Sequence, residues 1–378
     1  MLIGIDGNEA NIKQRVGVNV WAFELLKQFK RKKEKGIGQK EEIKFQIYLS
    51  RPPVADLPEE TEYWKYRVIG PGRLWTRWRL PLDLYFHKPR PDVFLSLSHY
   101  APKWSPVPRV VCVMDLSFLK YPEAFKPAVL WQLVNWTRES VRSADHVITI
   151  SEFNKREIMK EYGYPAEKIT VVYPGVSEAF KEEGGRKKEE GTSGKYLLFV
   201  GTLQPKKNLP RLIKAFEKVK NRFPDVRLMI AGKTWRQFAD EKFAKPLLNG
   251  EVSQTSQVKY LGYVPEEDMP DLYAGAEALV LPSLYEGFGI PAVEAMSVGT
   301  LVVASNTTSM PEVVGDAGIL FDPINIKDMA QKIEKVLSMN KIQRQSMIKK
   351  GMIKAVRFSW DIAANQMIKL FKLFSGEA

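Results

Sequence analysis

The strongest constraint on the fold is an alternation of strand-like and helix-like segments, which recurs in two successive blocks of the chain. The first block opens with the apolar run LIGID (2–6), followed by the helical pattern VNVWAFELLKQF (18–29). The second opens with KYLLFVGT (195–202), followed by LPRLIKAFEKV (209–219). Because parallel strands need crossover connections, usually helices, this alternation predicts an α/β protein with mainly parallel sheets.

The length of the chain and the segment between the blocks predict two domains. A chain of 378 residues is too long for one ordinary hydrophobic core. The blocks are separated by KEEGGRKKEEGTSGK (181–195), which is charged, glycine-rich and poor in apolar residues. We therefore expect a linker or surface loop there.

Composition limits the class of protein and of partner. The single cysteine, Cys112, excludes an internal disulfide and a cysteine metal cage, so a reducing, cytoplasmic setting is the default. The N-terminus lacks the layout of a signal peptide, and no apolar run reaches the roughly 18–20 residues of a bilayer span. The net charge of +13 suits nucleic acid, an anionic membrane surface or anionic small substrates. Without a zinc-finger or RNA-recognition signature, nucleic acid is disfavoured.

The stretch LPSLYEGFGIPAVEAMSVGT (281–300) has the pattern of a strand, a glycine turn and a helix. Pro291 suits the first helical turn, and Gly299 the position just after the helix. Gly287 and Gly289 let the backbone approach a ligand closely, and the free N–H groups at such a helix start attract phosphate.

Two carboxylates, Glu286 and Glu294, flank this turn. Glu294 lies in the first helical turn, where it could simply complement the helix dipole. The pair would repel phosphate, but carboxylates can accept two hydrogen bonds from a diol. A ligand with phosphate in the middle and a diol at each end satisfies all of these features. A nucleotide-sugar is such a ligand.

These residues resemble a known family. EGFGIPAVEAM resembles the Glu-x7-Glu signature of the retaining group 1 glycosyltransferases, which have the GT-B fold. RVGVN resembles the family's phosphate-facing glycine turn, and ITVVYPGV resembles the end of its first domain. FVGTLQPKKNLPRLIKAF resembles its lysine segment, and LGYVPEEDMPDLYAGAEALVLPS its donor-base loop. SMPEVVGDAGILFDP resembles the segment after the signature, and all of these segments occur in the family's order.

The resemblance implies two Rossmann-like domains that face each other across a cleft. The N-terminal, acceptor-binding domain would comprise residues 1–178 together with 358–378, whose helix WDIAANQMIKLFKLF would cross back onto it. Residues 179–194 would be the linker, and residues 195–357 the domain that binds the nucleotide-sugar.

The resemblance also assigns roles to individual residues. Glu294 would hold the donor ribose and Glu286 the transferred sugar. Lys207, with Lys206, would neutralise the departing diphosphate, although adjacent lysines are commonly only a solvated face. Both follow a strand at its C-terminal end, where open α/β sheets bind ligands. The other predicted donor-binding positions are Gly17, Gly201, Lys233, Tyr263, Val264, Gly287, Phe288, Gly289 and Ile290.

The implied chemistry is transfer with retention, in which the departing phosphate takes the proton of the acceptor hydroxyl. No Asp-x-Asp occurs in the chain, so we expect no metal site, and no cofactor besides the nucleotide-sugar co-substrate. The lysines and the helix start would stabilise the leaving group.

One position departs from the family pattern. After RVVCV, family members commonly have histidine and then an acidic residue, whereas this chain has Met114 and Asp115. His99, at the end of the preceding strand, could partly substitute for the missing imidazole or could be purely structural. Asp115 could contact the acceptor or order its loop.

A second segment, GPGRLWTRWRLPLDLYFHK (70–88), mixes arginine with tryptophan and leucine. It fits an amphipathic helix that packs its apolar residues inward. It also fits a patch that contacts anionic lipid or a lipid-linked acceptor.

The sequence thus predicts a cytoplasmic transferase of polysaccharide biosynthesis, in contact with the inner face of the membrane at most. It would move mannose or glucose from GDP-mannose or UDP-glucose to a hydroxyl of a glycan, a lipid-linked acceptor or a small molecule. Three alternatives remain: a nucleotide-sugar hydrolase or epimerase, a non-catalytic nucleotide-sugar-binding protein, and a basic membrane-surface scaffold.

Overall fold

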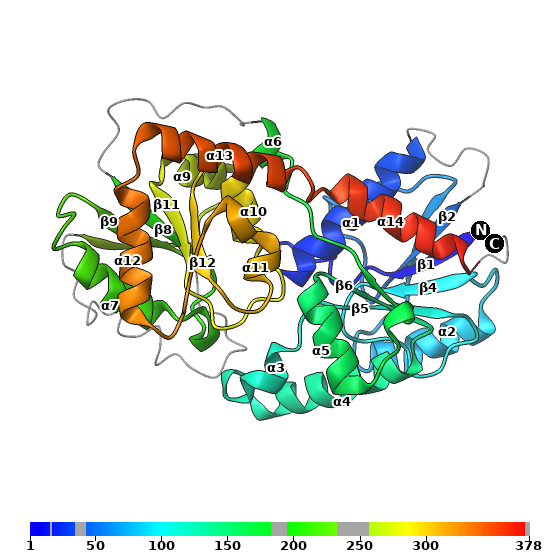
Figure 1. Cartoon of the computed structure of the whole chain (residues 1–378). Coiled ribbons are helices and arrows are strands. Elements are labelled where there is room, and N and C mark those ends of the chain that lie inside the picture. Colours follow the sequence, from blue (N-terminus) through cyan, green and yellow to red (C-terminus); the bar gives the residue numbers. More distant parts are fainter. Residues whose placement is uncertain (16, 35–42, 183–194, 233–256, 375–378) are drawn as a thin grey trace. The chain divides into compact units, whose positions relative to one another are not determined.

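The chain folds into two compact units. The computed structural model describes residues 1–15, 17–34, 43–182, 195–232 and 257–374 (Figure 1). The first unit comprises residues 1–116, 131–175 and 359–378, and the second comprises 117–130 and 176–358.

The first unit is built on a seven-stranded parallel sheet in the order β3-β2-β1-β4-β5-β6-β7. Its strands are β1 (Leu2–Asp6), β2 (Lys44–Leu49), β3 (Trp64–Val68), β4 (Val93–Ser96), β5 (Arg109–Val113), β6 (His146–Thr149) and β7 (Ile169–Val171). Its helices are α1 (Val18–Glu34), η1 (Trp75–Arg79), α2 (Leu80–Phe86), most of α4 (Pro127–Ser143), α5 (Glu152–Tyr162), η3 (Ala166–Lys168) and α14 (Trp360–Lys372).

The terminal helix α14 belongs to the core of the first unit. It lies beside α1 (Figure 1), and its residues Trp360 and Phe371 are buried against Trp21 and Phe29 of α1. The apolar spacing seen in the sequence therefore packs on this unit, because an amphipathic helix must bury its apolar stripe.

The second unit is built on a six-stranded parallel sheet in the order β10-β9-β8-β11-β12-β13. Its strands are β8 (Tyr196–Val200), β9 (Arg227–Ala231), β10 (Val258–Gly262), β11 (Ala278–Leu281), β12 (Val302–Ser305) and β13 (Ile319–Phe321). Its helices are α3 (Ser117–Lys120), η2 (Pro122–Ala124), α6 (Ala179–Glu182), η4 (Pro205–Lys207), α7 (Leu209–Val219), η6 (Glu266–Asp268), α9 (Met269–Gly275), α10 (Ile290–Ser297), α11 (Met310–Val313), η7 (Gly315–Ala317), α12 (Ile326–Leu337) and α13 (Lys341–Ala355).

Two segments group with the second unit although they are close in sequence to the first. The ring of Tyr121 packs edge-on against Tyr285, with 6.3 Å between their centroids. Helix α6, which occupies the start of the predicted linker, brings Phe180 to 5.7 Å from the ring of Tyr273. The remainder of that linker, 183–194, lies outside the described residues.

Candidate active site

The predicted donor residues of the second unit gather where the strand order changes direction. Strands β8 and β11 are neighbours in the sheet, but the chain leaves them toward opposite sides, which is where open α/β sheets bind ligands. Asn208, after β8, donates from Nδ2 to the carbonyls of Pro282 (2.9 Å) and Pro323 (2.7 Å). The N–H of Leu284 donates to the carbonyl of Lys206 at 2.8 Å. These bonds fasten the two loops together.

Lys207 and Glu286 meet at this junction. The ammonium group of Lys207 forms an ion pair with Glu286 Oε1, which also accepts a hydrogen bond from the hydroxyl of Ser283 at 2.8 Å. The Glu286 side chain is largely buried, and that of Lys207 is nearly so. A fixed cation and a fixed carboxylate therefore stand side by side, able to meet an anionic and a hydroxylated part of one ligand.

The glycine turn between the two glutamates is held from behind by residues that follow β12. The Ser309 hydroxyl lies 2.9 Å from the carbonyl oxygens of both Glu286 and Phe288. Thr308 Oγ1 accepts the N–H of Glu286 at 3.2 Å, and Thr308 has a φ of 56°, a left-handed conformation that is costly for a β-branched residue. Its presence beside the turn marks a loop held in a fixed shape.

Helix α10 begins directly at this turn. Gly289 occupies its N-cap position with a φ of 102°, and a Cβ there would lie 2.1 Å from Met310 Cε. The positive φ strongly favours glycine at this position, and no side chain makes a capping hydrogen bond at the start of α10. The predicted helix start is thus confirmed at Ile290, with backbone suited to oxygen anions.

Glu294 is half-buried and lies in the second turn of α10, so the expectation that it lies in the first turn was wrong. Its hydrogen-bond partner is a residue that no sequence motif singled out. The hydroxyl of Tyr273, on α9, donates to Glu294 Oε2 at 2.8 Å. Burial raises the pKa of Glu294 to about 7; the Tyr273 hydrogen bond opposes this rise, and the charge of Glu266 adds to it. Near neutral pH this carboxyl is poised between its charged and neutral forms.

The remaining donor candidates of the second unit lie around the same strand ends. Lys206 directs its ammonium group to the hydroxyl of Ser117 at 2.9 Å. A Cβ at Gly201 would lie 3.7 Å from Lys207 Cε, so these two positions adjoin. Tyr263 is exposed and Val264 half-buried after β10, whereas Lys233 lies outside the described residues.

The first unit has its own change of strand direction, between β1 and β4. Asp6, at the end of β1, is buried, and burial raises its pKa to about 7 against the opposing hydrogen bond from the Asn8 N–H. Nearby, Glu9 accepts a hydrogen bond from Asn19 Nδ2 at 2.6 Å, and burial raises its pKa too. Gly17, a predicted donor-binding position of this unit, has a φ of 54°. No sequence motif predicted either carboxylate.

The position of the expected histidine is part of the hydrophobic core. Met114 is buried with the apolar residues of the first unit, and its carbonyl accepts a hydrogen bond from Asn154 Nδ2. Asp115 and His99 are half-buried on loops after β5 and β4. The structure therefore brings Lys207, Glu286 and the glycine turn together in the second unit, and leaves His99, Asp115 and Gly17 in the first.

Comparison with protein families gives two matches that together span most of the chain. Residues 180–353 match the family described as glycosyl transferases group 1, and residues 40–180 match glycosyltransferase family 4. The first match contains both glutamates and Lys207.

Curated relatives are glycosyltransferases. The chain is 32% identical to the O-antigen chain mannosyltransferase B of Escherichia coli over 319 residues, which are 82% of this chain and 79% of that protein. It is 30% identical to the O-antigen chain mannosyltransferase RfbU of Salmonella typhimurium over 228 residues, or 60% of each chain.

Solved structures share the fold at lower identity. Sucrose-phosphate synthase from Thermosynechococcus elongatus matches with a TM-score of 0.73 at 18% identity, over 100% of both chains. Anabaena HepE, solved with UDP and glucose, matches with a TM-score of 0.71 at 18% identity, over 98% of this chain and 99% of its own. Together with the two parallel sheets, these matches confirm the predicted GT-B fold class.

Proposed function

Because the chain belongs to the group 1 glycosyltransferases, we propose that it is a retaining hexosyltransferase that moves a mannosyl unit from GDP-mannose to a hydroxyl of a glycan or lipid-linked acceptor. The mannosyltransferase relatives support mannose as the sugar. Glucose from UDP-glucose is the second choice of donor.

The observation that carries the proposal is the ion pair of Lys207 and Glu286 beside the start of α10. In our proposal Glu286 accepts hydrogen bonds from hydroxyls of the transferred sugar. The helix start and Lys207 hold the diphosphate, and Glu294 accepts hydrogen bonds from the ribose hydroxyls. One donor molecule would thus meet both glutamates through its two sugar rings.

The proposed chemistry depends on stabilising the departing diphosphate. As the bond from the anomeric carbon to the phosphate oxygen breaks, negative charge grows on that oxygen, and the Lys207 ammonium group stabilises it. The acceptor hydroxyl attacks from the same face, and its proton passes to the phosphate oxygen. We propose that this transfer needs no metal ion, because a lysine and a helix start can carry the compensating charge.

Buried Met114 supports a second candidate, a protein that binds a nucleotide-sugar without transferring it efficiently. The side chain at this position offers neither a proton donor nor an acceptor to a reacting sugar. A hydrolase or an epimerase is the remaining alternative on the same fold.

A donor panel separates these functions. The protein is first screened by thermal shift against UDP-, GDP- and ADP-sugars, and the stabilising donor is then incubated with and without mannose-terminated oligosaccharides, in the presence and absence of EDTA. Acceptor-dependent release of nucleoside diphosphate, with an α-linked product by NMR, supports the proposal. Release without acceptor would identify a hydrolase, and binding without any turnover would identify a binding protein.

A further inference from the structure

The helical segment formed by η1 and α2 in the first unit carries two apolar faces. One face, with Trp75, Leu80 and Leu84, is buried against the sheet beside Tyr48 and Phe94. The predicted inward packing of the segment is therefore confirmed for this face only. The structure leaves a second apolar face to be explained.

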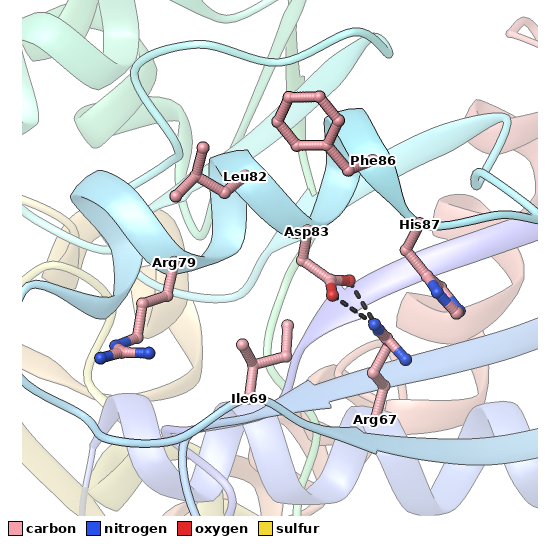
Figure 2. Close-up of a pocket in the computed structure, with 7 residues that line it drawn as sticks. All are labelled: Arg67, Ile69, Arg79, Leu82, Asp83, Phe86 and His87. Atoms are coloured by element: carbon pink, nitrogen blue, oxygen red, sulfur yellow. Dashed lines mark hydrogen bonds and ion pairs between the residues drawn. The ribbon is translucent and has the colours of Figure 1, made fainter.

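The opposite face points outward. Trp78 and Leu82 are each 53% exposed, and Phe86 is 82% exposed. Figure 2 shows Phe86 extending from α2 away from Asp83, whose carboxylate turns toward Arg67. Positions 78, 82 and 86 are four residues apart and so share one side of a helix.

This outward face continues onto neighbouring elements. The ring centroids of Trp78 and Trp104 lie 5.5 Å apart. Trp104 also lines an open pocket of about 510 Å³ together with Trp131 on α4. We define the aromatic patch as the exposed apolar side chains of η1 and α2 together with the two tryptophans of this pocket: Trp78, Leu82, Tyr85, Phe86, Trp104 and Trp131. Within the described residues, the patch holds five of the six largely exposed aromatic side chains. Single exposed apolar residues are ordinary, but such a concentration marks an interaction surface.

Positive charge surrounds the patch. Two carboxylates near the patch are engaged in ion pairs, Asp83 with Arg67, and Glu139 with both Arg77 and Lys103. Further exposed basic side chains flank the patch in sequence or line its pocket: Arg73, Arg79, Lys88, Arg90, Arg138 and Arg142. The surface is therefore complementary to an anionic partner.

Tryptophan beside arginine or lysine is the combination that proteins place at the boundary between lipid headgroups and acyl chains. Indole and phenyl rings enter the boundary, while the cations meet lipid phosphates. No helix in the described part of the chain is long and apolar enough to span a bilayer. We propose that the aromatic patch binds the surface of an anionic lipid bilayer from one side, independently of donor binding.

The test is co-sedimentation of the whole protein with vesicles of phosphatidylcholine alone or mixed with phosphatidylglycerol. We expect binding to the anionic vesicles, and we expect it to weaken as salt rises, because salt screens the lipid charge. Phe86→Ser with Trp131→Ser should lower the partition coefficient about tenfold, since two aromatic anchors are lost. The double variant Arg138→Gln with Arg142→Gln should weaken binding to the anionic vesicles but not binding to vesicles of phosphatidylcholine alone.

Matched controls come from helix α13 of the second unit. Ile342 and Ile353 are also strongly exposed, as are Lys341 and Lys349. Replacing the isoleucines by serine, or the lysines by glutamine, should leave vesicle binding unchanged. Thermal-shift midpoints, with and without donor, check that every variant is folded.

Three results would overturn the proposal. Binding that is equally strong on phosphatidylcholine alone would remove the role of charge. Equal losses in the control variants would remove the role of the patch. Absence of vesicle binding would overturn the proposal as a whole. In that case, saturable binding of free oligosaccharide, or patch-dependent self-association in sedimentation velocity, would show what the patch contacts instead.

Discussion

The two units use the same place in their sheets differently. In the second unit, the junction after β8 and β11 pairs a cation with a carboxylate, Lys207 with Glu286, inside loops that are bonded to each other. In the first unit, the junction after β1 and β4 holds the buried carboxyl of Asp6 and the half-buried carboxyl of Glu9, and Met114 fills the position of the expected histidine. The same place in a parallel sheet therefore holds an ion pair of lysine and glutamate in one unit and two carboxyls with raised pKa values in the other.

The largest expected effect tests the second unit. Lys207→Met should lower kcat about 10³-fold, because it removes the cation that stabilises the departing diphosphate, while donor affinity should fall less than about tenfold. Steady-state kinetics and calorimetry measure the two quantities. The matched control is Lys218→Met, an exposed lysine on α7. Equal losses in kcat and in affinity would mean that Lys207 merely anchors the bound donor.

An intermediate effect tests the bond from Tyr273 to Glu294. In its proposed role Glu294 accepts hydrogen bonds from the ribose hydroxyls as a carboxylate, so donor affinity should fall as the pH drops below its pKa of about 7 and level off above it. Tyr273 donates to the charged form, so Tyr273→Phe should raise this pKa further. Donor binding should then be about tenfold weaker at pH 7 and should converge with the wild type at high pH.

The control for this prediction is a variant that cannot titrate. Glu294→Gln should abolish the pH step in donor affinity, even though Asp6 in the first unit also titrates near pH 7. If the pH step in donor affinity persists in Glu294→Gln, another titrating group causes it. Isothermal titration across pH, using the intact nucleotide-sugar, decides the matter.

The smallest expected effect tests the first unit. Met114→His should change kcat less than about threefold, because the side chain packs among apolar residues of the core. The variant should instead lower the free energy of unfolding by about 1–3 kcal/mol, the cost of burying an unpaired polar group. Turnover and chemical denaturation measure the two effects. A tenfold gain in kcat would show that an imidazole here serves catalysis and would support the weakly active alternative.

Much of the fold, and of the junction after β8 and β11, could be predicted from sequence. The alternating pattern located strands such as LIGID and KYLLFVGT, because apolar runs of strand length between helices identify buried parallel strands. The turn EGFGIP predicted the start of α10, because glycine and proline constrain the backbone directly. The roles of the individual site residues remain predictions.

Other features depend on tertiary packing that no local pattern encodes. Tyr273 reaches Glu294 from a different helix, and the hydroxyl of Ser309 holds two carbonyls of the glycine turn from beyond β12. The raised pKa of Asp6 comes from burial, and GIDGNE alone does not reveal that burial. The sequence of segment 75–86 allowed two interpretations, inward packing or a surface patch, because its apolar residues lie on two faces. Only the fold shows which face is covered.

The central claim is that Glu294 holds the ribose and Glu286 the transferred sugar of one donor molecule. Calorimetric titration of the Glu294→Gln and Glu286→Gln variants, with the selected nucleotide-sugar and with its nucleoside diphosphate, tests it most directly. We predict that Glu294→Gln weakens both ligands alike, about tenfold or more, whereas Glu286→Gln weakens only the intact nucleotide-sugar. The claim would be contradicted if Glu286→Gln weakened binding of the nucleoside diphosphate as much as binding of the nucleotide-sugar. It would also be contradicted if Glu294→Gln left the affinity for the nucleoside diphosphate unchanged.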